Sequence, residues 1–194
     1  MKQLLVSTVV VAASILITEG PAYADDRRCA GTIGARTIDG NVIVPEGRTC
    51  RLVGTGVDDN VFVKANARLI ARGVTIGGNI QAENHQLVRV LRRRVGDRYV
   101  RSRIGADIQL TSGRFSEIRR AVIGGNLQSK QNTRQQYAVM NRIGGDLQAF
   151  SNRNGYRIHR NVIDGNLQCK SNSPPPTGDQ NRVQGNKEDQ CRSM

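Results

Sequence analysis

The chain of 194 residues contains no tryptophan, and aromatic residues make up only 4% of it. Globular domains draw much of their core volume from large aromatic side chains, whereas a narrow stack of strands fills its interior with valine, isoleucine and leucine. No stretch after residue 24 approaches the roughly 18 uninterrupted apolar residues that a membrane-spanning helix needs. The composition therefore favours a slim core and gives no sign of a membrane-spanning segment in the mature chain.

The first 24 residues have the layout of a secretory signal peptide. Lys2 precedes an apolar run from Leu4 to Ile17, and the small-residue motif Ala22–Ala24 follows. We therefore expect cleavage near Ala24, a mature protein of residues 25–194, and an extracytoplasmic location, either secreted or periplasmic.

Cysteine is scarce, with four residues arranged as one pair near each end of the mature chain. An even number of cysteines in an exported chain predicts disulfides. Three pairings are possible, and the short separations favour Cys29 with Cys50 and Cys169 with Cys191. Because neither pair has a CxxC spacing or a nearby histidine, we predict no metal site and no cofactor.

The charge is strongly one-sided, with a formal net charge of +13 at pH 7. Of the 29 basic residues, 24 are arginine and 5 are lysine. The planar guanidinium group matches carboxylate and phosphate geometry, so this bias indicates a polyanionic neighbour. The competing explanation is a GC-rich genome combined with selection for solubility.

The dominant feature of the mature chain is a repeated hexapeptide. Its clearest copy, Ile76–Gln81, reads IGGNIQ, and an Asn or Asp stands at the fourth position of every copy. The other seven copies are Ile38–Ile43, Val57–Phe62, Ile104–Gln109, Ile123–Gln128, Ile143–Gln148, Ile163–Gln168 and Val183–Glu188. Successive copies lie 19 or 20 residues apart, except for one step of 28 residues.

A repeat of this length is too short for a helix pair but suits one coil of a parallel β-helix. The first position of each copy is Ile or Val, and the fifth is apolar until Lys187, as expected for two inward-facing columns. The Asn or Asp marks a corner, and its amide can bond from coil to coil. A column of Gln side chains and a further turn at Asn132, Asn152 and Asn172 repeat with the same period. We therefore predict an all-β, single-domain, right-handed parallel β-helix (β-solenoid) of about eight coils.

The long step contains a basic insertion near residues 91–103. Extra residues in a stacked coil must project outward, which makes this insertion the strongest candidate for binding a polyanion. The alternative is a solvated loop. The candidate binding residues are Arg92, Arg93, Arg94, Arg98, Arg101 and Arg103.

The two cysteine pairs fall at the two ends of the repeat array. Open solenoid ends expose strand edges, so capped ends are expected to prevent molecules from stacking on one another. This placement predicts a monomeric rod.

The sequence shows no catalytic constellation. Asp39 and Asp58 occupy equivalent positions in adjacent coils and could share a proton or hold calcium, but ordinary turn aspartates explain them better. His85 and His159 lie at different phases of the repeat and cannot pair. No catalytic residue is therefore assigned.

Residues 163–191, with the run IDGNLQCKSNSPPPTGDQNRVQGNKEDQC, resemble the ending of small exported bacterial proteins of unassigned function. Residues 29–81, with DGNVIVPEGRTC and VTIGGNIQ, are similar to their N-terminal half. The repeat is also loosely similar to that of bactofilins, the polymer-forming β-helices, which lack a signal peptide and terminal cysteines. The resemblance implies a β-helix fold and assigns no functional residue.

Three functions are compatible with these observations. The first is a non-enzymatic exported module that engages acidic glycans, lipopolysaccharide or another polyanion through its arginines. The second is a small polysaccharide lyase or hydrolase that uses Asp39 and Asp58 or a groove that the sequence does not reveal. The third is a self-assembling scaffold.

Overall fold

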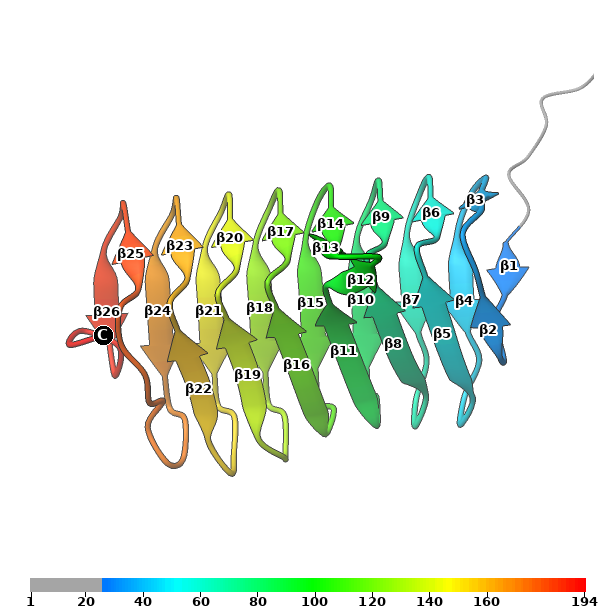
Figure 1. The fold of residues 1–194 in the computed structure, drawn as a ribbon. Helices are drawn as coiled ribbons and strands as arrows, with labels where there is room; N and C mark the ends of the chain where they lie inside the picture. Colours follow the sequence, from blue (N-terminus) through cyan, green and yellow to red (C-terminus); the bar gives the residue numbers. More distant parts are fainter. Residues whose placement is uncertain (1–25) are drawn as a thin grey trace, which may run out of the picture.

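The computed structural model describes residues 26–194, so the predicted signal peptide lies outside the described residues. Residues 26–194 contain no helix and form a parallel β-solenoid of about eight turns, the predicted fold (Figure 1). Each complete coil passes through three parallel sheets, which we call C, A and B in the order in which the chain meets them. The hexapeptide spans a C strand, a corner and the start of an A strand.

Sheets A, B and C contain nine, seven and eight strands, respectively. Sheet A consists of β1 (Arg27–Arg28), β4 (Val42–Val44), β7 (Val61–Val63), β10 (Ile80–Glu83), β15 (Ile108–Thr111), β18 (Leu127–Lys130), β21 (Leu147–Phe150), β24 (Leu167–Lys170) and β26 (Lys187–Asp189). Sheet B consists of β2 (Thr32–Ile33), β5 (Thr49–Val53), β8 (Arg68–Arg72), β11 (Leu87–Leu91), β16 (Phe115–Arg119), β19 (Gln136–Val139) and β22 (Tyr156–His159). Sheet C consists of β3 (Thr37–Ile38), β6 (Gly56–Val57), β9 (Thr75–Ile76), β14 (Arg103–Ile104), β17 (Val122–Ile123), β20 (Arg142–Ile143), β23 (Val162–Ile163) and β25 (Arg182–Val183).

The core is a set of columns in which equivalent side chains stack directly. Ile123, Ile143 and Ile163 are paired in register on sheet C, and each is at most 1% exposed. A second buried column, on sheet A, contains Leu127, Leu147 and Leu167. Alternation sends every second strand residue outward, so the strand pattern itself decides which side chains are available to a ligand.

Asparagine ladders satisfy the buried backbone at all three corners. At the corner between sheets C and A, the Asn60 backbone N–H donates to Asn41 Oδ1 at 3.0 Å, and the pattern continues to Asn186. The predicted turn between sheets A and B is also present and carries a second ladder, with the Asn132 N–H donating to Asn152 Oδ1 at 3.1 Å. A third ladder, Asn141, Asn161 and Asn181, was not predicted and lies between sheets B and C. The predicted glutamine column is hydrogen-bonded from Gln148 through Gln168 to Glu188.

Both predicted disulfides are present. Cys29 bonds to Cys50 and Cys169 bonds to Cys191, with Cα atoms 5.4 and 5.3 Å apart. Each bridge lies at one end of the solenoid, where the stack of coils offers the fewest neighbours. The bridges therefore tie down the terminal coils, as the cysteine spacing predicted.

The long step does project from the solenoid, but as an ordered hairpin. Strands β12 (Arg93–Val95) and β13 (Arg98–Val100) pair antiparallel and lie between β11 and β14, at the corner between sheets B and C (Figure 1). The Ser102 hydroxyl donates to the Leu91 carbonyl at 2.8 Å and closes the base of the insertion. The regular stack resumes at β14, so the insertion leaves the core register intact.

Candidate functional site: a basic face on sheet B

The outward surface of sheet B carries almost entirely positive charge. Its strands contain six arginines and one acidic residue, Glu117. The six are Arg51, Arg68, Arg72, Arg89, Arg119 and Arg157. The strands of sheet A are mixed, with basic residues offset by Glu83, Glu188 and Asp189. The strand alternation thus gathers arginines that are distant in sequence onto one flat surface, which we call the basic face.

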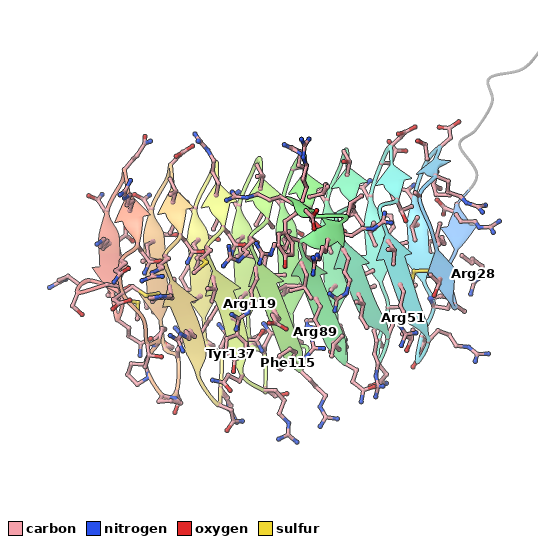
Figure 2. The ribbon with its side chains drawn as sticks, in the orientation of Figure 1. Arg28, Arg51, Arg89, Phe115, Arg119 and Tyr137 are labelled. Carbon is pink, nitrogen blue, oxygen red and sulfur yellow. A yellow bond between two sulfur atoms is a disulfide. The ribbon has the colours of Figure 1, made fainter. Side chains whose placement is uncertain are left out.

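The centre of this face is an ordered cluster of arginines and aromatic rings (Figure 2). Arg89 Nε lies 3.1 Å from Glu117 Oε2, and Arg119 Nε lies 2.5 Å from Glu117 Oε1. The Arg89 guanidinium also lies over the Phe115 ring at 5.4 Å, and that of Arg119 over the Tyr137 ring at 5.0 Å. One carboxylate and two rings therefore hold two cations in place.

A shallow depression lies where the basic face meets the corner between sheets A and B. It has a volume of about 490 Å³, and its floor is apolar because Leu87 and Phe115 face it. The remaining lining residues are Arg68, Gln86, Arg114, Arg134 and Gln135. Gln86 accepts a hydrogen bond from Arg68 Nε at 2.8 Å, which orients that guanidinium. Three arginines from three coils thus converge with no acidic residue in the lining.

A second depression of about 300 Å³ lies at the opposite edge, between the basic face and the hairpin. Its lining combines five arginines with two apolar side chains and contains no acid. The lining residues are Arg72, Leu91, Arg92, Arg94, Tyr99, Arg119 and Arg120. Arg92 lies over the Tyr99 ring at only 3.5 Å, so the hairpin contributes an arginine that is already immobilised. An anionic group placed here would meet cations from both the sheet and the hairpin.

The predicted binding residues of the insertion are divided among several surfaces. Arg92 and Arg94 join the edge of the basic face. Arg93 packs along the corner over Gly54 and Gly73, where a Cβ built on Gly73 would lie 2.6 Å from Arg93 Cβ. Arg98 and Arg101 are exposed. The sixth, Arg103, faces outward from sheet C.

Sequence reasoning missed most of the basic face. Arg51, Arg89 and Arg157 occupy one outward column, and Ile70, Glu117 and Tyr137 separate them along it. The signal was present in the strand alternation of segments such as TCRLV and LVRVL. Assigning the register of these less regular strands needed the coordinates.

The two aspartates considered for an enzymatic role lie away from the basic face. Asp39 and Asp58 are exposed and stand in successive coils at the corner between sheets C and A. Within residues 26–194, no group of three or more His, Cys, Asp or Glu is arranged to hold a metal ion. His159 pairs with Asp179 on sheet B, whereas His85 is buried at the corner between sheets A and B.

Burial lowers the pKa of His85 to about 4, and the Ala82 backbone offsets this only in part. Neither ring nitrogen makes a well-formed hydrogen bond. The ring fills the space over Gly113, where a Cβ would lie 2.1 Å from His85 Cε1. This histidine therefore acts as a neutral packing element of the corner.

No helix in the described part of the chain is long and apolar enough to cross a membrane. Comparisons with protein-family models, with curated proteins and with solved structures found no match to the chain. The basic face is therefore interpreted from its own geometry.

Proposed function

We propose that the protein is an exported, non-enzymatic binding module whose basic face holds linear polyanions, such as acidic glycans of the cell envelope or its surroundings. The observation that carries this proposal is the charge of the sheet B strands, six arginines against one glutamate on one flat surface. Export is supported by the two disulfides, which are typical of oxidising compartments.

The repeat of the solenoid supports a linear ligand. Successive coils place equivalent positions about 4.8 Å apart. Arg51 and Arg89 are two coils apart in one column, which corresponds to roughly 10 Å, and Arg157 lies three coils beyond Arg89. A chain that carries charged groups along its length can therefore meet several guanidinium groups when it lies along the solenoid axis.

The central cluster supports recognition of sulfate, carboxylate or phosphate groups. Arg89 and Arg119 are held by Glu117 and by aromatic rings, so less side-chain freedom is lost when they bind an anion. Phe115 and Tyr137 add apolar surface beside these cations, with ring centroids 5.8 Å apart. Sugar rings can use such surface, whereas a bare phosphate chain cannot.

The test is the affinity of the disulfide-bonded protein for heparin, polygalacturonate and long-chain polyphosphate, measured by calorimetry at two salt concentrations. The face variant is R51Q/R72Q/R157Q, which removes three exposed arginines that make no ion pair within residues 26–194. The control is R103Q/R142Q/R182Q, which removes the same charge from sheet C, where Arg142 lies 3.7 Å from Asp164.

We expect the face variant to bind at least one of these polymers more weakly and to reduce the slope of log K against log salt by about 2 to 3. The sheet C variant should change both quantities much less. Equal losses in the two variants would show that net charge alone drives binding, and absence of binding by the unmodified protein would end the proposal. The preferred polymer distinguishes glycan from polyphosphate.

A further inference from the structure

The hairpin β12–β13 concentrates the exposed apolar side chains of the solenoid. Four large hydrophobic residues are exposed within residues 26–194, and three of them are in the hairpin. They are Val95 at 48%, Tyr99 at 52% and Val100 at 40%, and the fourth is Val162 on sheet C at 36%. Every other large apolar side chain in this part of the chain is at least partly buried. An ordered projection that presents its apolar residues to solvent is typical of a contact surface.

Each of these apolar residues stands beside an arginine. The antiparallel register pairs Arg93 with Val100, Arg94 with Tyr99 and Val95 with Arg98. Directly opposed residues share one face of a two-stranded sheet, so both faces of the hairpin mix cationic and apolar groups. Between residues 92 and 101 there are five arginines and a single acid, Asp97.

The hairpin is held in place before any ligand arrives. Arg92 stacks on Tyr99, and Arg93 packs against Gly54 and Gly73 at the corner of two preceding coils. Arg94 Nε donates to the Gly96 carbonyl at 3.0 Å and secures the turn. The projection therefore needs little ordering when it meets a surface, which favours binding.

We propose that this hairpin docks the solenoid on an anionic lipid surface. Val95, Tyr99 and Val100 enter the boundary between headgroups and acyl chains, and the neighbouring arginines meet lipid phosphates. Tyrosine and arginine are the residues that favour this interface, and basic residues close to it are attracted by anionic lipids. The inference differs from polyanion binding by the basic face in resting on the apolar residues of the hairpin, although Arg72 and Arg119 at its base belong to both surfaces.

Two alternative occupants fit less well. A hydrophilic polymer would gain nothing from exposed valines. A stable protein partner usually contacts about 20 to 30 residues on each side, many more than a hairpin with two three-residue strands offers. The second depression adds to the lipid proposal, because its five arginines lie at the base of the hairpin and can hold phosphate groups of the headgroups.

The absence of tryptophan allows a clean reporter. Tyr99→Trp places one indole on the exposed hairpin, and Tyr137→Trp places one on the basic face as the matched control. Each disulfide-bonded variant of the mature protein, residues 25–194, is titrated with vesicles of phosphatidylcholine alone and with vesicles that contain phosphatidylglycerol. We expect a blue shift and quenching by brominated acyl chains for Tyr99→Trp on the anionic vesicles only, and neither change for Tyr137→Trp. No response from Tyr99→Trp would overturn the proposal.

A second pair of variants separates lipid docking from polyanion binding. V95N/V100N keeps every charge, and Val162→Asn alters an exposed valine away from the hairpin. We expect V95N/V100N to reduce the partition coefficient onto anionic vesicles about tenfold and to leave heparin binding unchanged. Val162→Asn should change neither. If V95N/V100N weakens heparin binding and spares vesicle binding, the hairpin belongs to the polyanion site and lipid docking is wrong.

Discussion

The asparagine ladder between sheets B and C allows a sharp stability prediction. Asn161 is fully buried and takes part in four side-chain hydrogen bonds. Its Nδ2 donates to the Ala138 carbonyl at 2.8 Å and to Asn181 Oδ1 at 3.0 Å. Its Oδ1 accepts from the Asn141 backbone N–H at 3.0 Å and from Asn141 Nδ2 at 3.1 Å. Asn161→Ala removes all four and leaves a buried backbone donor unsatisfied.

The magnitude follows from these contacts. An unsatisfied buried donor costs about 1–3 kcal/mol, and each other lost bond costs about 1 kcal/mol before any local compensation. We expect Asn161→Ala to reduce the free energy of unfolding by about 3 to 5 kcal/mol. The matched control is Gln148→Ala on sheet A, which removes one half-buried amide contact of 2.9 Å that water can replace. It should cost less than about 1 kcal/mol.

The assay is guanidinium chloride unfolding at pH 7, followed by circular dichroism, with unfolding free energies compared at a common m-value. A loss for Asn161→Ala that is no greater than that for Gln148→Ala would refute the reasoning. It would show that satisfaction of the corner backbone does not depend on the ladder.

Three further predictions concern the corner at His85 and one terminal bridge. Burial lowers the pKa of His85 to about 4, so the unfolded chain binds more protons than the folded chain between pH 6.5 and 4. The free energy of unfolding should therefore fall by up to about 3 kcal/mol as the pH drops through this window. His85→Leu should remove that part of the pH dependence in denaturant titrations. Gly113→Asn should lower the thermal midpoint, because the new side chain meets the His85 imidazole. Adding His85→Asn should restore stability by extending the asparagine ladder between sheets A and B, which now ends at Gly113. A double variant that shows no recovery would contradict this packing argument. C29S/C50S should lose about 3 kcal/mol in chemical unfolding, and an unchanged midpoint would show that the terminal coil needs no bridge.

The sequence by itself determined the solenoid, its two bridges, the asparagine ladder of the hexapeptide and the turn that carries a second ladder. The period of the hexapeptide places like residues in columns, and Ile123, Ile143 and Ile163 could form a continuous dry stack only if the coils lie directly over one another. The two cysteines at each end of the repeat array are separated by only 21 and 22 residues, which likewise favoured one local disulfide at each end. Such features are periodic or local, so they can be recognised without coordinates.

Only the tertiary structure decided which arginines act together. Arg51, Arg89 and Arg119 come from three coils, and their convergence depends on the register of sheet B, whose strands repeat too irregularly to be aligned by eye. The insertion was recognised as basic, yet its division between the basic face, the corner and an exposed hairpin follows from antiparallel pairing within it. A charge pattern fixes how much attraction the surface has for anions, whereas the geometry of the stack fixes where that attraction is focused.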